Sequence, residues 1–146
     1  MAGCSDKKEN KKNIETAKTD QSEEHWIDYT SKDSIPNLLN EALVNLNTGN
    51  FQLADPNEKF NANDIINDSL PRQKLSLLSN SGNKWRLTYI QGGFGKYYVY
   101  AQCEIKNDSI YNFQVAESVL ILENNDSIDK YISENTLKLK NVPIKS

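Results

Sequence analysis

The chain has 146 residues, and its 17 basic and 20 acidic side chains give a formal net charge of -3 at pH 7. This length fits one domain with a tail, and the mild acidity does not supply the clustered basic surface that nucleic-acid binding needs. No apolar run approaches the roughly 20 residues of a membrane-spanning helix. With a single histidine, His25, a metal cage of Cys and His is not expected, and we predict neither a metal nor another cofactor.

The first 24 residues are strongly polar. From Ser5 to Glu24 the chain consists almost wholly of Lys, Glu, Asp, Asn, Ser, Thr and Gln, with Ile14 as an isolated large apolar residue. Such a segment cannot bury enough apolar surface to order itself. We therefore expect residues 1–24 to form a disordered tether and residues 25–146 to form one domain.

The tether begins with Ala2-Gly3-Cys4, followed by a charged run from Ser5 to Glu9. This start resembles the processing site of bacterial lipoproteins, in which the cysteine carries the lipid. The charged run is similar to export signals of surface lipoproteins in the Bacteroidetes. Met1 stands where that family usually has Leu, and the basic and apolar parts of a leader are missing, as expected of a truncated start or a replaced leader.

The resemblance implies that Cys4 is lipidated and that a membrane is a partner through this anchor. It also implies a location in the bacterial cell envelope, at the outer membrane with a periplasmic or surface face. The alternative is an ordinary disordered N-terminus with a chance cysteine.

The first apolar cluster runs from His25 to Tyr29 and marks the edge of the domain, as a short strand or a helical turn. A catalytic base at His25 would need a nucleophile, and no Ser or Cys partner is recognisable by motif. A surface or half-buried histidine is the simpler interpretation. We predict no catalytic residue and no enzyme activity.

The stretch from Ser34 to Gly49 predicts the best helix of the chain. Ser34 or Asp33 can cap it, Pro36 is tolerated in the first turn, and Gly49 lies where a left-handed C-terminal cap belongs. One apolar stripe follows the helical i, i+3, i+4, i+7 spacing: Ile35, Leu38, Leu39, Ala42, Leu43 and Leu46. A helix on a membrane surface is the alternative, but the polar face carries no Lys or Arg.

Four acidic residues follow this helix: Asp55, Glu58, Asp64 and Asp68. Their spacing does not match the calcium loop of an EF-hand. We interpret them as solvated caps and turns rather than as a metal site.

The following part of the chain is mostly strand-like. Period-2 alternation broken by short turns, such as Asn107-Asp108, predicts an antiparallel meander. Its expected strands are residues 74–78, 85–90, 96–106, 109–115, 119–122 and 136–140, with one helical turn at 127–133. Cys103 alternates with apolar neighbours, which predicts a buried thiol and does not suggest a disulfide with Cys4.

The candidate partner-binding residues are the aromatics of the meander. Phe94 lies in a glycine turn, which lacks the following helix of a phosphate loop; it is either an interface anchor at the loop tip or folded onto the sheet. Tyr98 and Tyr100 share the strand face opposite Val99. Tyr111 joins either face, depending on register. Tyr-rich sheet faces are common binding surfaces, because Tyr offers large area at low entropy cost.

The predicted fold class is α+β, with one long N-terminal helix packed on a twisted antiparallel meander of five to six strands. This order of elements is weakly similar to the NTF2-like and cystatin-like folds, a similarity that carries no function. A lipocalin-like barrel is the structural alternative, which the long helix disfavours.

Two non-enzymatic functions are compatible with these sequence features, and an enzyme is a disfavoured third, because no pairing of nucleophile, base and orienting group is recognisable. The first is an envelope lipoprotein whose globular domain is a non-enzymatic binding module for another protein, such as an immunity or inhibitor protein against a secreted toxin or hydrolase. The alternative is a small-ligand carrier with an apolar pocket between helix and sheet.

Overall fold

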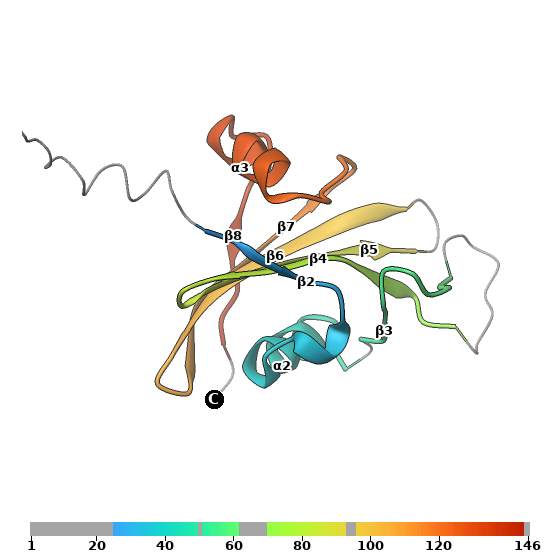
Figure 1. The fold of residues 1–146 in the computed structure, drawn as a ribbon, viewed down its shortest axis with the longest axis horizontal. Helices are drawn as coiled ribbons and strands as arrows, with labels where there is room; N and C mark the ends of the chain where they lie inside the picture. Colours follow the sequence, from blue (N-terminus) through green and yellow to red (C-terminus); the bar gives the residue numbers. More distant parts are fainter. Residues whose placement is uncertain (1–24, 50, 62–69, 93–95, 145–146) are drawn as a thin grey trace, which may run out of the picture.

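A seven-stranded sheet forms the centre of the computed structural model, which describes residues 25–49, 51–61, 70–92 and 96–144. Its strands are β2 (Ile27–Tyr29), β3 (Leu53–Ala54), β4 (Gln73–Ser81), β5 (Lys84–Gln91), β6 (Tyr97–Lys106), β7 (Ser109–Ser118) and β8 (Lys140–Asn141). The helical elements are η1 (Lys32–Ser34), α2 (Asn37–Leu46) and α3 (Asn125–Ser133). Figure 1 shows their arrangement.

The strand order is β2-β4-β5-β6-β7-β8, and all of these pairs are antiparallel. The short β3 pairs with β4 in parallel at the other end of that strand. The predicted antiparallel meander is therefore confirmed in β4 to β7. Its last turn uses Asn107 and Asp108 with φ of 52° and 62°, the positive values that suit a tight hairpin.

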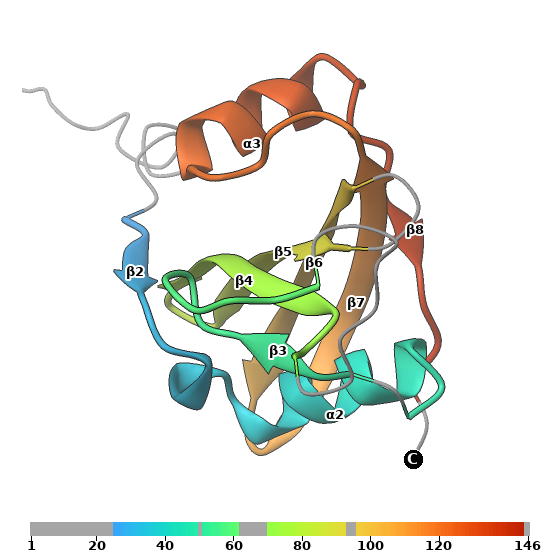
Figure 2. The ribbon, with the colours of Figure 1, turned by 90° about the vertical axis from the view of Figure 1, so that its right-hand side faces the viewer.

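The predicted fold class, one long N-terminal helix packed on five to six strands, was wrong. The sheet has seven strands, and the described residues contain two short α-helices, α2 with ten residues and α3 with nine. These helices cover opposite faces of the sheet, as Figure 2 shows. Helix α2 ends at Leu46. Just beyond it, Thr48 and Gly49 take positive φ values of 52° and 88°, a left-handed conformation that terminates a helix.

The face under α2 carries the larger core. Leu39 and Leu43 of the helix are fully buried against Leu75, Leu87 and other apolar side chains of the sheet. The predicted burial of Cys103 is confirmed, because its thiol lies in this same core. Apolar side chains thus fill the space between α2 and the sheet.

The face under α3 carries a smaller core. Tyr98, Tyr100 and Ala116 of the sheet are buried against Leu122 and Ile128. Helix α3 is capped by Asn124, whose side chain accepts a 2.8 Å hydrogen bond from the backbone N–H of Ser127. This cap satisfies one of the free N–H groups of the first turn.

Three local predictions around α3 need correction. Residues 119–122 form a loop instead of a strand, because β7 continues to Ser118 and ends the pairing there. The single helical turn expected at 127–133 is the complete helix α3, and the edge strand expected at 136–140 is the shorter β8. Among the described residues, none of the helices is long and apolar enough to span a membrane.

Candidate binding surfaces

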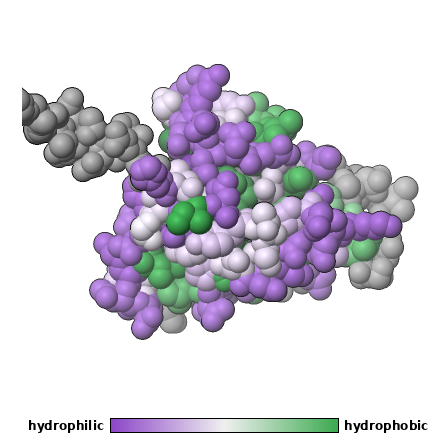
Figure 3. All heavy atoms as spheres, in the orientation of Figure 1, coloured by the Kyte–Doolittle hydropathy of each residue, from purple (hydrophilic) through white to green (hydrophobic). Residues whose placement is uncertain are grey.

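The loop that joins β7 to α3, residues 119–124, carries two exposed branched aliphatic side chains. Val119 is 85% exposed and Ile121 is 59% exposed. Leu120 and Leu122 alternate with them and pack into the core under α3. Figure 3 shows hydrophobic atoms gathered at the position of this loop beside α3. The β7–α3 loop therefore exposes Val119 and Ile121 to solvent, while Leu120 and Leu122 anchor the loop to the core under α3.

Hydrogen bonds fix the shape of the β7–α3 loop. The Leu120 N–H donates to Ser118 Oγ at 2.9 Å, and the Thr88 hydroxyl donates to the Leu122 carbonyl at 2.7 Å. The Tyr98 hydroxyl donates to Glu123 Oε2 at 3.1 Å. Burial, together with the hydrogen bond and the charge of Glu123, raises the pKa of Tyr98 to about 12. Tyr98 therefore keeps the proton that it donates to this loop.

The sequence-predicted partner residues have different positions in the structure. Tyr100 is fully buried and Tyr98 is 8% exposed, both beneath α3, so neither ring is available at the surface. Tyr111 is 46% exposed, and the Lys106 ammonium lies 5.8 Å from the centre of its ring. Phe94 and the predicted lipidation residue Cys4 lie outside the described residues.

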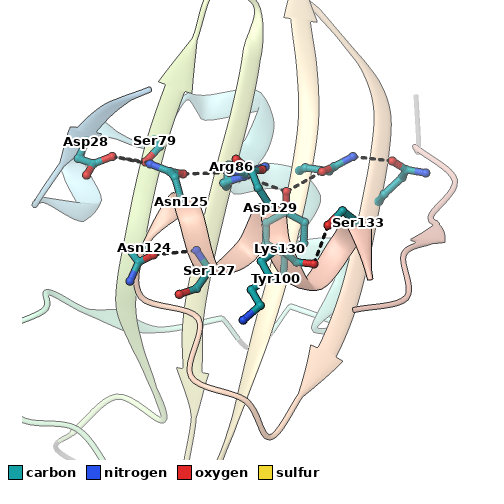
Figure 4. Close-up of polar contacts among 12 residues, drawn as sticks. Asp28, Ser79, Arg86, Tyr100, Asn124, Asn125, Ser127, Asp129, Lys130 and Ser133 are labelled. Atoms are coloured by element: carbon teal, nitrogen blue, oxygen red, sulfur yellow. Dashed lines mark hydrogen bonds and ion pairs between the residues drawn. The ribbon is translucent and has the colours of Figure 1, made fainter. Parts of the chain in front are cut away.

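A second surface is built around Arg86, which β5 directs toward the α3 side of the sheet. Its Nε–H donates to the Tyr100 hydroxyl at 3.1 Å, Nη1 donates to Asn125 Oδ1 at 3.1 Å, and Nη2 pairs with Asp129 Oδ1 at 2.7 Å. The Trp26 ring centre lies 4.2 Å from the guanidinium carbon. Figure 4 shows Arg86, Tyr100, Asn125 and Asp129 converging from two strands and α3.

The charge of Arg86 is well compensated although the side chain is buried. Burial by itself lowers the pKa of Arg86, but its interactions with Tyr100 and Asp129 outweigh this effect and raise the pKa above its ordinary value. The guanidinium therefore remains charged and acts as a fixed hydrogen-bond donor.

A row of amides continues this hydrogen-bond network across the sheet. The Tyr100 hydroxyl donates to Gln102 Oε1 at 2.6 Å, and Gln102 Nε2 donates to Gln114 Oε1 at 2.7 Å. Gln114 Nε2 then donates to Asn141 Oδ1 on β8 at 2.9 Å. The network thus fixes the orientation of two glutamine amides on neighbouring strands.

In the other direction the network reaches the edge strand β2. Asn125 Nδ2 donates to Asp28 Oδ1 at 3.1 Å and to Ser79 Oγ at 3.2 Å. The Ser79 hydroxyl also donates to Asp28. Asp28 and Asn125 are 97 positions apart in sequence, so the network ties the start of the domain to α3.

A hollow of about 250 Å³ lies next to Arg86, beyond the part of the sheet that α3 covers. Its side chains combine an indole, amides and charged groups, among them Trp26, Arg86, Gln102, Glu104, Asn112 and Gln114. Lys84 also lines it and lies opposite Glu104 in the register of β5 and β6. This hollow offers hydrogen-bond donors and acceptors rather than an apolar cavity.

A third surface is a groove of about 360 Å³ between α2, β7 and the C-terminal segment. Its lining is mostly apolar and includes Leu38, Ala42, Leu46, Ile110, Phe113 and Val142. The groove lies at the margin of the core rather than between α2 and the middle of the sheet, which Leu39 and Leu43 fill. The described residues contain no group of three His, Cys, Asp or Glu side chains that could hold a metal ion.

Sequence reasoning missed both the exposed pair and the Arg86 network. In the run Val119 to Leu122 all four residues are apolar, so the sequence does not indicate which pair faces outward. A usable signal for the network was present in the two glutamines, because Gln102 and Gln114 each stand between two apolar neighbours in the sequence. Comparisons with models of protein families, with curated protein sequences and with solved structures found no match for this chain.

Proposed function

We propose that this chain is a non-enzymatic protein-binding module and that the β7–α3 loop is its main contact. The observation that carries the proposal is the pair of exposed side chains, Val119 and Ile121. Transferring such apolar surface from water into an interface is favourable by roughly 25 cal/mol per Å². Exposed apolar side chains that lie two positions apart on one loop can form an interaction site.

The fixed shape of the loop supports a binding role. Leu122, Thr88 and Tyr98 hold the loop on the sheet, so a partner meets the apolar pair in a defined position. A preorganised loop loses less conformational freedom on binding, which leaves more of the contact energy for affinity. A partner of the kind that an immunity or inhibitor protein neutralises, a secreted toxin or hydrolase, would need such a rigid contact.

The test of this proposal uses two isoleucines that match in exposure. Ile121 is 59% exposed on the β7–α3 loop, and Ile27 is 58% exposed on the edge strand β2. Full-length protein, Ile121→Ser and Ile27→Ser are used as baits in lysates of the source organism and of its competitors, and captured proteins are identified by mass spectrometry. We expect a stoichiometric partner with wild type and Ile27→Ser, and its loss with Ile121→Ser. Equal capture by all three baits, or capture of no stoichiometric protein, contradicts the proposal.

We also propose that the module is held at the cell envelope by a lipid on Cys4. The support is the sequence Ala2-Gly3-Cys4 and the polar residues that follow it. In the full-length gene, Cys4→Ala should move the protein from the membrane fraction to the soluble fraction, while Ser5→Ala should leave it in place. Unchanged fractionation of Cys4→Ala would rule out the anchor.

A small-ligand carrier is the second candidate function, and the α2–β7 groove favours it. The groove has room for a small apolar molecule and an apolar lining. A fluorescent apolar dye should bind the wild-type protein, and Leu38→Asp should weaken the binding because it places a charge in the groove. Ile27→Asp, at a distant exposed position, serves as the control. Equal dye binding by all three proteins would exclude the groove as the ligand site.

A further inference from the structure

We propose that the hollow beside Arg86 binds one ring of a neutral saccharide. This binding site lies on the open part of the sheet and shares no lining residue with the β7–α3 loop. The inference is therefore independent of the protein-binding function proposed above. It rests on four properties of the hollow: its hydrogen-bonding groups, their fixed orientation, its internally paired charges and the indole of Trp26.

The hydrogen-bonding groups match those of a polyol. Gln102, Gln114 and Asn112 line the hollow with amides, and Glu104 adds a carboxylate. An amide offers both donors and acceptors. A sugar hydroxyl also donates and accepts, so neighbouring hydroxyls can pair with the same amide. An apolar ligand would leave the remaining hydrogen-bonding capacity of these groups unused, which is unfavourable.

The amides are held in orientation before any ligand arrives. Gln102 accepts from Tyr100 and donates to Gln114, and Gln114 donates in turn to Asn141. Each glutamine amide carries two N–H groups and two lone pairs on its oxygen. The network uses one N–H of each, so the second can donate to a ligand without a change of rotamer. Such preorganisation lowers the entropic cost of binding.

The main charged groups at the hollow have charged partners within the protein. Arg86 is paired with Asp129, and Glu104 lies opposite Lys84 in the sheet register and pairs with Lys106 at 3.8 Å. A site for phosphate or sulfate would instead present an excess of positive charge to the ligand. Because the Arg86 guanidinium is already bonded to Tyr100, Asn125 and Asp129, the hollow favours an uncharged ligand with many hydroxyl groups.

Trp26 supplies the apolar face that a sugar ring needs. Its ring lines the hollow and is placed by the guanidinium of Arg86 at 4.2 Å. Pyranose rings carry C–H groups on their faces, and a flat indole offers a large amphipathic surface for them. The volume of about 250 Å³ is smaller than the pockets that hold drug-sized molecules, so one ring is the expected occupant.

The test begins with the full-length protein and named neutral sugars: glucose, galactose, mannose and N-acetylglucosamine. Binding is followed by NMR, through the side-chain amide signals of Gln102 and Gln114, with inorganic phosphate as the charged comparison. We expect at least one sugar to shift these two signals in a saturable way and phosphate to leave them unchanged. Absence of saturable shifts with every sugar, or a stronger response to phosphate, overturns the proposal.

Two variants then test the named contacts. Trp26→Ala removes the indole, and Gln114→Met keeps the length of the side chain without its hydrogen bonds. Each should weaken sugar binding by about tenfold, the effect of one lost hydrogen bond or an equivalent contact, whereas Gln52→Ala at an exposed site elsewhere should not. Far-UV circular dichroism and thermal unfolding confirm that each variant is folded. Unchanged sugar affinity in both folded variants overturns the proposal. If either variant does not fold, the NMR shifts of the wild-type protein described above are the test.

Discussion

The two faces of the sheet differ in how a helix packs against each of them. Among the described residues, the core under α2 contains 14 buried residues and the core under α3 contains seven. Helix α2 packs through apolar side chains, chiefly Leu39 and Leu43. Helix α3 is joined to the sheet by Ile128 and by the polar contacts that Asn125 and Asp129 make with Arg86. These differences indicate a division of roles, in which the α2 face supplies stability and the α3 face supplies orientation and contact surfaces.

This division has a physical basis. Apolar burial is non-directional and grows with area, so the α2 face gains stability from any close packing of its leucines. Hydrogen bonds contribute less net stability but require defined geometry. The contacts of Asn125 and Asp129 with Arg86 therefore orient α3 on the sheet, and with it the end of the β7–α3 loop.

The largest expected effect is on the α2 face. Leu43→Ala removes a fully buried side chain, and such a change destabilises a protein by about 2–5 kcal/mol. Equilibrium unfolding in urea measures the loss, and Glu41→Ala on the exposed side of the same helix should change stability by less than about 0.5 kcal/mol. A similar midpoint for both variants would mean that the α2 face is not the main source of stability.

Replacing the arginine of the α3 face should have a smaller effect. Arg86→Met breaks the bonds to Tyr100 and Asn125, and we expect a loss of about 1–3 kcal/mol from buried groups that lose a partner. Asp129 is 54% exposed, so Asp129→Asn should lose at most about 1 kcal/mol, as for surface ion pairs. Urea unfolding of both variants gives the comparison. A greater loss in Asp129→Asn than in Arg86→Met would assign the stability to the ion pair instead.

The burial of Tyr89 on the α2 face should also make the stability of the protein depend on pH at high pH. Burial raises the pKa of Tyr89 from 10.0 to about 12, although the hydrogen bond from Asn47 acts in the opposite direction. Below pH 10 the residue is protonated in both states, so it adds no pH dependence. Between about pH 10 and 12 the unfolded state ionises first, and stability should fall as the pH rises.

Urea midpoints across this pH range measure the effect. Tyr89→Phe should flatten the fall in midpoint, whereas Tyr111→Phe, which changes a half-exposed tyrosine on the other face, should keep the wild-type slope. An identical slope in wild type and Tyr89→Phe would show that Tyr89 is accessible to ionisation in the folded protein.

The smallest expected effect is on the reactivity of the Cys103 thiol and involves no change of stability. Burial, with a smaller effect of Glu104, raises the pKa of Cys103 to about 12, and the unreactive form is the protonated thiol. In a Cys4→Ser background, a thiol reagent at about pH 8.5, where a free cysteine is half ionised, should modify Cys103 only as fast as the protein unfolds. A Tyr111→Cys variant should react at once on the open face. Rapid labelling of Cys103 in the folded protein would show that the α2 face opens locally.

The meander could be predicted because its information is local. Alternation in β5, β6 and β7 assigns each side chain to one of two faces, and Asn107-Asp108 tolerates the positive φ of the hairpin turn. Cys103 was assigned correctly for the same reason. The predicted fold class was wrong about one long helix. That prediction assumed that a single apolar stripe makes all of the helix packing against the sheet.

The covering of the second face could not be predicted in the same way. Tyr98 and Tyr100 have the same sequence pattern whether they face solvent or a helix. Their burial depends on α3, and the helical pattern at 127–133 does not indicate which face of the sheet that helix covers. The Arg86 network depends on residues distant in sequence, such as Asp28 and Asn125, which no local pattern relates.

The attachment of β2 has a mechanical consequence. A pulling force on the N-terminal side of the domain reaches the sheet through β2, which has three register pairs with β4, whereas β4 and β5 share eight. Under such a load we therefore expect the pairing of β2 with β4 to break before the pairing of β4 with β5. Because Trp26 precedes β2 and stacks on Arg86, peeling of this strand would withdraw the indole from the hollow. Tension along the chain and occupancy of the hollow would then oppose each other.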